Sequence, residues 1–310
     1  MEAIERIFRD DSFKPEQDFT PLILSAMKKT ILAFAIVLTS LFPAAVPACA
    51  EEQPSPVKIL SIGNSFSVNA HHYLAKICET SGKPVVLGNA MIGGCTMERH
   101  WKNASTNGVC YRYKNQAMTL AQMLEAEKWQ YVTIQQASWY SQNPATYEPF
   151  GTRLMEFIRT HAPQAEIVLH ETWAYRGDEK RIAKAGLTPY EMYAKIEKAY
   201  KQFAAAHNLR TIPAGWAFKT AWDTPEWGLR VVADQKTGAP AKGKPLHRKD
   251  GYHANAFGEY LLGLVWAKTL LDIDPGEVTY VPKDVGETYA NLLKKIASAA
   301  VSTYQGAETH

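Results

Sequence analysis

The sequence lacks a strong charge of either sign. Its 34 lysine and arginine residues nearly balance 31 aspartate and glutamate residues, which leaves a formal net charge of +3 at pH 7. The basic residues are scattered along the chain rather than clustered. Proteins that bind nucleic acid usually gather basic residues on one face, so this pattern argues against a nucleic-acid partner.

The chain also lacks an apolar run that would span a bilayer comfortably. The run Ile31–Leu41 is too short for that, and it follows the basic pair Lys28 and Lys29. Small residues come next and end in Ala-Cys-Ala, as is typical of a secretory signal peptide. We therefore expect residues 27–50 to be removed on export to the periplasm or the exterior, leaving no stable membrane span. Lipid attachment at Cys49 is the less favoured alternative.

Residues 1–26 do not fit the start of a signal peptide because they carry several acidic side chains. We interpret Met27 as the true initiator and residues 1–26 as a disordered upstream extension. Residues 51–310 then form one domain, since no repeat or linker divides them. A chain of 310 residues with 46% hydrophobic residues can bury one large core.

Cysteine is scarce, with four residues in the whole chain. Removal of the signal peptide would leave Cys78, Cys95 and Cys110 in an oxidising compartment. We expect one disulfide, between Cys95 and Cys110. Cys78 occupies an apolar position of a predicted helix, which indicates a buried thiol.

Short apolar runs alternate with segments of helical periodicity. This alternation predicts βαβ units, and therefore an α/β fold with a parallel sheet covered by helices on both faces. The segment 222–248 has no periodicity and is interpreted as a long surface loop that shapes the site. The expected strands are 57–62, 85–89, 131–135, 167–170 and 209–212, and the expected helices are 70–80, 119–128, 147–161, 189–207, 254–271 and 285–302.

Two short motifs carry the chemistry. Gly63-Asn64-Ser65 follows the first predicted strand, and Asp250-Gly-Tyr-His253 precedes a predicted helix. A serine hydroxyl needs a base to remove its proton, and a histidine of near-neutral pKa suits that task. A carboxylate is needed to orient the imidazole and to stabilise its charged form. The pair of motifs therefore indicates a serine esterase.

With these motifs the chain resembles the SGNH (GDSL-like) hydrolase superfamily along essentially its whole mature length. The resemblance implies a three-layer α/β/α sandwich with a flavodoxin-like parallel sheet and no cofactor or metal. It also implies Ser65 as nucleophile, His253 as general base and acid, and Asp250 as its orienting partner. The usual Gly-Asp-Ser stands here as Gly-Asn-Ser, which retains the nucleophile.

The oxyanion hole departs further from the family pattern. Gln135-Gln136 follows the central strand where the family presents an asparagine, and this is similar to the glutamine variant in sialate and xylan acetylesterase-like branches. A glutamine amide can also donate to an oxyanion, so Gln136 is assigned this role, with Gln135 as the competing choice. The backbone N–H groups of Ser65 and Gly94 would complete the hole, and Gly93 is the alternative to Gly94.

We expect the protein to be a secreted serine esterase that removes acyl groups, chiefly acetyl, from a carbohydrate. Gln135, His100, Trp173 and Tyr175 are candidates for contacting the substrate because they follow predicted strands. A lipid or short-chain acyl esterase and a non-catalytic carbohydrate-binding protein remain alternatives. A metal-dependent hydrolase is disfavoured because no two histidines have a tight ligand spacing such as His-x-x-x-His.

Overall fold

A computed structural model describes residues 55–227 and 244–308 of the chain. All of them belong to the unit Glu52–His310, into which the chain divides after Glu51. The predicted extension, the signal peptide and Cys49 lie outside the described residues, as do residues 228–243 of the predicted surface loop. No helix in the described ranges is long and apolar enough to cross a membrane.

A five-stranded parallel sheet lies at the centre of the described unit. Its strand order is β2-β1-β5-β6-β7, so the predicted α/β fold class is confirmed. β1 lies between β2 and β5, and the direction of the chain connections reverses there; a crevice at the carboxyl ends of the strands is expected beside such a reversal. The strands are β1 (Val57–Gly63), β2 (Val85–Met91), β5 (Tyr131–Ile134), β6 (Glu166–His170) and β7 (Arg210–Ile212).

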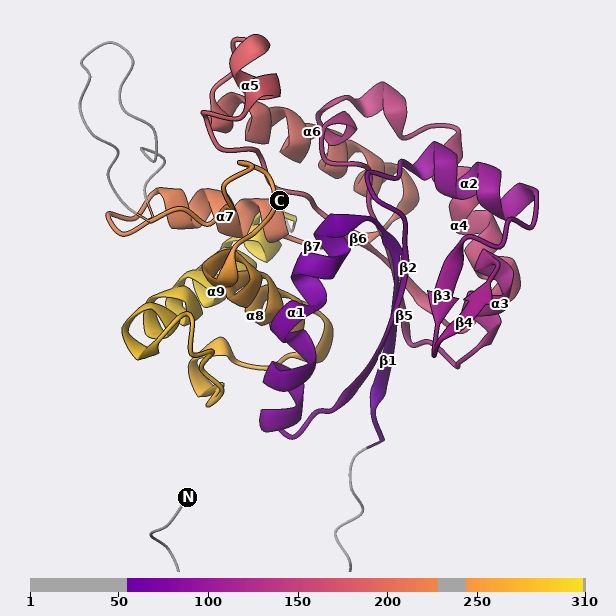
Figure 1. Cartoon of the computed structure of the whole chain (residues 1–310), viewed down its shortest axis with the longest axis horizontal. Helices are drawn as coiled ribbons and strands as arrows, with labels where there is room; N and C mark the ends of the chain where they lie inside the picture. Colours follow the sequence, from indigo (N-terminus) through magenta and orange to yellow (C-terminus); the bar gives the residue numbers. More distant parts are fainter. Residues whose placement is uncertain (1–54, 228–243, 309–310) are drawn as a thin grey trace, which may run out of the picture. The chain divides into compact units, whose positions relative to one another are not determined.

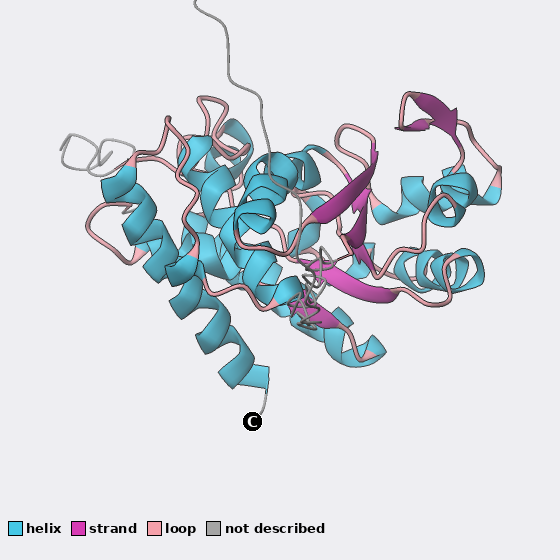
Figure 2. Cartoon of the chain, turned by 90° about the horizontal axis from the view of Figure 1, so that it is seen from below, coloured by secondary structure: helices cyan, strands magenta, loops and turns pink. Residues whose placement is uncertain are grey.

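Helices cover both faces of this sheet, which gives three layers (Figure 1). On one side lie α1 (Ser65–Thr80), α8 (Ala256–Leu271) and α9 (Glu287–Glu308), and on the other lie α2 (Met97–Ser105), α3 (Leu120–Glu125) and α4 (Phe150–His161). The remaining helices are α5 (Lys180–Lys184), α6 (Pro189–His207) and α7 (Ala214–Trp222), with short 3-10 turns η1 (Tyr140–Gln142), η2 (Pro144–Thr146) and η3 (Pro275–Glu277). A hairpin of β3 (Tyr111–Tyr113) and β4 (Gln116–Met118) stands apart from the main sheet (Figure 2).

The burial pattern explains why these segments form the core. Ile59 to Gly63 of β1 are all buried, as expected for a central strand covered on both faces. α8 is apolar almost all round and nearly wholly buried, so it packs between α1 and α9. These two elements therefore fix the position of the chain segments that follow β1 and precede α8.

The predicted strands and helices are all present; α6 has the predicted ends, and the other elements differ at one or both ends. α1 begins at Ser65 rather than at residue 70, because the Asn64 side chain accepts a hydrogen bond from the Phe66 N–H and caps the helix there. α2, α5, α7 and the β3–β4 hairpin were not expected from the sequence. Each of these helices and strands is short, with three to nine residues.

The predicted disulfide between Cys95 and Cys110 is wrong. Cys78, Cys95 and Cys110 are all free thiols. Cys95 is buried whereas Cys110 is exposed, and their sulfur atoms are not bonded to each other. The prediction of a buried Cys78 is confirmed, and burial raises the pKa of that thiol to about 12.

Candidate active site

Ser65 stands at the carboxyl end of β1 and is the first residue of α1. Its side chain is partly exposed, while Asn64 and Phe66 on either side are buried. The preceding Gly63 is required by space, because a Cβ at that position would lie 2.7 Å from Oε1 of Gln135. β1 thus ends at Gly63 against the Gln135 side chain, and α1 begins two residues later with the partly exposed Ser65.

Asn64 holds this turn with both ends of its amide. Its Oδ1 accepts from the Phe66 N–H at 3.0 Å, and its Nδ2 donates to the Cys95 carbonyl at 3.2 Å. An aspartate could cap the helix in the same way, but its carboxylate could not donate to a carbonyl. The asparagine thus joins the turn after β1 to the turn after β2.

Asp250 and His253 occupy a tight loop in front of α8. Oδ1 of Asp250 accepts from the backbone N–H groups of Tyr252 and His253, at 3.1 and 3.0 Å. Gly251 between them has φ +81°, a left-handed conformation that glycine adopts without strain. The carboxylate therefore shapes the loop with one oxygen and keeps the other free for the imidazole.

The three side chains form a continuous chain of hydrogen bonds. Oδ2 of Asp250 lies 2.8 Å from Nδ1 of His253, and Nε2 of His253 lies 2.7 Å from Oγ of Ser65. A carboxylate can only accept, so the imidazole carries its proton on Nδ1 and Nε2 is left to accept from the serine. This arrangement is able to remove the proton from Ser65 when the hydroxyl attacks an electrophile.

The electrostatics of the loop keep Asp250 ionised. Burial alone would raise the pKa of this carboxyl. The hydrogen bonds from the His253 side chain and from the Tyr252 and His253 N–H groups outweigh it, and the pKa lies below its ordinary value. A carboxylate that stays charged at neutral pH stabilises the imidazolium that forms when His253 takes a proton.

Arg176 and Arg248 hold the loop in position. The Arg176 guanidinium donates to the carbonyls of Arg248 and Lys249 at 2.9 and 3.2 Å, and its backbone N–H donates to the Gly251 carbonyl at 2.8 Å. Arg248 in turn donates to the buried carboxylate of Glu259 at the start of α8. The sequence offered no signal for the roles of Arg248 and Glu259, because neither stands within a recognisable motif.

Two backbone donors are available beside Ser65. The Ser65 N–H is at the first position of α1, where helical geometry leaves it without a partner in the helix. Gly94 has φ +59°, and within the described residues neither its N–H nor that of Gly93 has a hydrogen-bond partner. The hydrogen bond from the Ile92 N–H to the Gly63 carbonyl, at 3.3 Å, holds these glycines next to the turn of Ser65.

The two glutamines are buried and already engaged. The Gln136 amide donates to the Thr146 carbonyl at 2.6 Å, and its oxygen accepts from the N–H groups of Met97 and Ala137. Gln135 donates to Oδ1 of Asn64 at 3.1 Å. The oxyanion role of Gln136 remains a prediction that its contacts do not favour, and Gln135 supports the turn of Ser65 through Asn64.

His100 and His170 lie beneath the site rather than in it. His100 is buried, with Nε2 3.0 Å from the Gly63 carbonyl and Nδ1 3.0 Å from the Tyr111 hydroxyl. His170 is buried against Gln135, with Nδ1 3.0 Å from Oε1 of that residue. Burial lowers the pKa of His100 to about 4 and that of His170 to about 3, so both stay neutral at physiological pH.

The expectation that His100, Trp173 and Tyr175 contact the substrate is not supported, because all three are fully buried. Trp173 stacks on Phe66 at 3.9 Å between ring centroids and donates from Nε1 to the Tyr252 carbonyl at 2.8 Å. It therefore supports both Ser65 and the loop of His253 from behind. The sequence could not separate a core aromatic from a lining one at the end of a strand.

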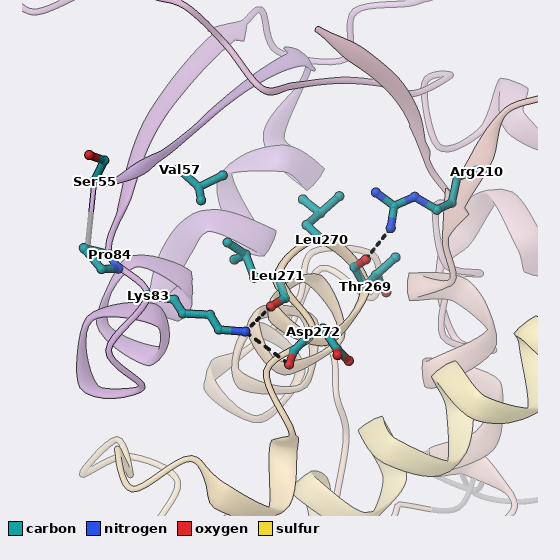
Figure 3. Close-up of a pocket in the computed structure, with 9 residues that line it drawn as sticks. All are labelled: Ser55, Val57, Lys83, Pro84, Arg210, Thr269, Leu270, Leu271 and Asp272. Carbon is teal, nitrogen blue, oxygen red and sulfur yellow. Dashed lines mark hydrogen bonds between the residues drawn. The ribbon is translucent and has the colours of Figure 1, made fainter. Parts of the chain in front are cut away.

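A hollow of about 400 Å³ lies at the amino-terminal ends of the strands, opposite the end that carries Ser65 (Figure 3). Lys83 donates to the Leu271 carbonyl at 2.6 Å, and Arg210 donates to the Thr269 carbonyl at 2.7 Å. Both cations thus satisfy carbonyls in the last turn of α8, where the helix dipole favours positive charge. These contacts stabilise the helix end and lie away from Ser65.

The described ranges contain no group of three or more histidine, cysteine, aspartate or glutamate side chains arranged to hold a metal ion. The imidazole of His253 instead lies between a carboxylate and a hydroxyl. These two hydrogen bonds have the order found in a Ser-His-Asp triad.

Comparisons with known proteins agree with this architecture. A family described as a domain of unknown function, DUF4886, matches residues 58–300. The crystal structure of a DUF4886 family protein from Bacteroides uniformis is 27% identical, covers 80% of this chain and 95% of its own, and has a TM-score of 0.68. No curated protein matches the chain.

A second solved structure relates the fold to a larger group. It is described as a candidate SGNH hydrolase from Slackia heliotrinireducens, with 24% identity, coverage of 70% of this chain and 100% of its own, and a TM-score of 0.50. At that identity the likeness concerns the fold alone. The predicted SGNH-hydrolase fold, a helix-covered parallel sheet, is confirmed.

Proposed function

The chain belongs to the DUF4886 family, and from that premise we propose that it is a serine esterase that hydrolyses esters with Ser65, His253 and Asp250. The observation that carries the proposal is the chain of hydrogen bonds from Asp250 through His253 to Ser65, with distances of 2.8 and 2.7 Å. A binding protein has no need of such an alignment, because it activates no nucleophile.

The reaction follows the geometry of the triad. Oγ of Ser65 attacks the ester carbonyl carbon while Nε2 of His253 accepts the hydroxyl proton. The carbon–oxygen bond to the alcohol then breaks, and His253 returns the proton to the leaving oxygen. Water, deprotonated by the same imidazole, attacks the acyl-serine and releases the carboxylic acid and the free serine.

The negative charge that develops on the carbonyl oxygen needs donors. The N–H of Ser65 and that of Gly94 or Gly93 are the available groups, and the open surface at both glycines leaves room for a substrate oxygen. We expect the backbone to supply this hole without the Gln136 side chain, which is occupied by Thr146.

We propose a carbohydrate as carrier of the ester and acetyl as the acyl group. Tyr252 is a partly exposed aromatic residue next to His253, and Trp139 is connected to it through the ring of Tyr175; both offer rings on which sugars can stack. Acetyl is inferred from the resemblance to acetylesterase branches. Export is inferred from the signal-like residues 27–50, and a substrate outside the cytoplasm is consistent with it.

Hydrolysis of para-nitrophenyl acetate and longer para-nitrophenyl esters by the wild type and by Ser65→Ala tests the proposal. We expect turnover in the wild type and a loss of about 10⁴-fold or more in the variant. Preference for acetate over longer chains would support an acetylesterase, and preference for long chains would favour a lipid esterase. Equal turnover in the two proteins would remove Ser65 as nucleophile, and no turnover in a folded wild type would favour a binding role.

A further inference from the structure

An aromatic cluster with one arginine adjoins the catalytic histidine. The rings of Tyr252 and His253 lie 4.3 Å apart, and those of Tyr175 and Tyr252 lie 5.5 Å apart. The guanidinium of Arg181, on α5, lies 4.6 Å from the Tyr175 ring and 4.8 Å from the Tyr252 ring. Arg181 is thereby held in one orientation, two ring contacts away from the triad.

The guanidinium keeps unused donors. Its Nε donates to Oε1 of Glu179 at 2.9 Å, while neither terminal nitrogen has a hydrogen-bond partner in the ranges that the structure describes. The Arg181 side chain is 42% exposed and is ion-paired with the Glu179 carboxylate through Nε, so its two terminal nitrogens are the donors that it can still offer to a ligand. A planar fork of this kind matches a carboxylate well.

The cluster continues into a hollow. Arg181 also lies 5.8 Å from the ring of Trp139, and Trp139 lines a hollow of about 600 Å³ together with Tyr140, Lys195 and Lys198. Both lysines are exposed, and neither takes part in an ion pair within the described residues. The charge of Lys195 contributes to lowering the pKa of Glu191. Aromatic and cationic side chains therefore run from His253 into this hollow.

The chemistry of ester hydrolysis indicates whether this cluster faces the acyl part or the alcohol part of the substrate. His253 must give its proton to the leaving alcohol, so the alcohol part of the ester lies against that imidazole. The glycine turn after β2 takes the carbonyl oxygen instead. A cluster that touches His253 through Tyr252 therefore contacts the alcohol part, which is the carrier of the acyl group.

We infer that the carrier is an acidic glycan that bears carboxylate groups. The sugar nearest the ester lies against Tyr252 with its carboxylate on Arg181, and the following units pass Trp139 into the hollow, where Lys195 and Lys198 meet further carboxylates. This inference rests on the proposed esterase function and narrows its substrate. It assigns the recognition of the carrier's carboxylates to Arg181, Lys195 and Lys198, which are not part of the triad.

A pair of matched esters tests the role of Arg181. Para-acetoxybenzoate carries a carboxylate on its leaving phenol, and its methyl ester is the neutral counterpart. We compare the ratio of kcat/KM for the two esters between wild type and variants, because the ratio cancels the effect of a variant on general activity. We expect Arg181→Gln to lower this ratio about tenfold, and Arg181→Lys, which keeps the charge, to retain part of it.

A second pair locates the preference. Mono-para-nitrophenyl succinate carries its charge on the acyl side, with para-nitrophenyl butyrate as the neutral counterpart. We expect Arg181→Gln to leave this kcat/KM ratio within about twofold of wild type. A twofold change in the ratio is smaller than the change expected from the loss of one hydrogen bond. An equal change in both pairs, or a change in the acyl-side pair alone, would contradict the placement at the alcohol.

Binding tests the distal cations without requiring turnover. We titrate Ser65→Ala protein with oligogalacturonate and with a neutral cello-oligosaccharide of equal length. Combining Lys195→Ala and Lys198→Ala with Ser65→Ala should weaken oligogalacturonate binding about threefold to tenfold and reduce the salt dependence of its dissociation constant. The matched control replaces Lys294 and Lys295 on α9 by alanine, which removes the same charge and should leave binding unchanged.

The outcomes separate the two proposals. Hydrolysis of the neutral ester with an unchanged ratio in Arg181→Gln would overturn the inference and leave the esterase intact. No hydrolysis of any ester, with preferred and lysine-dependent binding of oligogalacturonate, would overturn the esterase and leave the acidic-glycan site. Equal binding of both oligosaccharides, or an equal loss in the α9 control, would overturn the assignment of Lys195 and Lys198.

Discussion

The exposed edge of the site and the polar layer beneath it use the same kinds of residue for different purposes. At the edge, His253 is partly exposed and bridges Asp250 and Ser65. In the layer beneath, His100 and His170 are fully buried and hold Gly63 and Gln135. The contrast teaches that solvent access and hydrogen-bond partners, rather than residue type, distinguish the histidine proposed as general base from the two that support the fold.

The carboxylates show the same contrast. Asp250 lies in the exposed loop, and hydrogen bonds lower its pKa. Glu171, directly after β6, is fully buried, and burial raises the pKa of its carboxyl to about 8 against the hydrogen bond from the Trp216 N–H. Asp250 is therefore held charged beside His253, while Glu171 is kept neutral inside the fold and supports the first turn of α7.

The largest expected effect on kcat comes from removing the Asp250 carboxylate at the exposed edge of the site. Asp250→Asn keeps the shape of the loop but removes the carboxylate that fixes the proton on Nδ1 of His253. We expect kcat to fall by about 10³- to 10⁴-fold while the free energy of unfolding changes by less than about 1 kcal/mol. Steady-state kinetics and urea unfolding of the same protein measure both; a large loss of stability with little loss of kcat would contradict the distinction.

The buried acid should control the pH dependence of stability. The Glu171 carboxyl has its ordinary pKa of 4.5 in the unfolded chain and a pKa of about 8 in the folded protein, so the native state binds the extra proton between these pH values. Its contribution to stability is present below about pH 4.5 and is lost as the pH rises toward about 8, with a slope of at most about 1.4 kcal/mol per pH unit.

Glu171→Gln isolates this contribution because the amide stays neutral at every pH and can still accept from the Trp216 N–H. We expect the fall in the free energy of unfolding from pH 5 to pH 8 to be smaller in the variant than in wild type. Urea unfolding at both pH values measures this difference. Parallel pH profiles for the two proteins would show that Glu171 does not titrate across the window.

The smallest expected effect concerns Gln136, for which the sequence and the geometry disagree. A lost oxyanion donor costs about 10²- to 10³-fold in kcat. Gln136→Leu should instead change kcat by less than about fivefold and lower stability by about 1–3 kcal/mol, since Met97 and Ala137 lose their acceptor. A fall in kcat of a hundredfold or more with unchanged stability would restore Gln136 to the oxyanion hole.

The predictable part of the molecule has strong local signals. β1 is a mainly apolar run, and Ser65, Asp250 and His253 stand in two short motifs, so the elements that carry them could be inferred from the sequence. Arg181 was missed because it lies on a five-residue helix without periodicity. His100, Trp173 and Tyr175 were expected near the substrate because the end of a strand faces both the site and the core, and only packing decides between them.

The central claim is that Ser65 is the nucleophile activated by His253, and covalent labelling tests it most directly. The protein is treated with a fluorophosphonate, and the adduct is counted by intact mass and located by peptide mapping. We predict one adduct on Ser65, none in Ser65→Ala, and strongly slowed labelling in His253→Ala. An adduct on a different serine that persists in Ser65→Ala, or no adduct in protein that hydrolyses esters, would contradict the account.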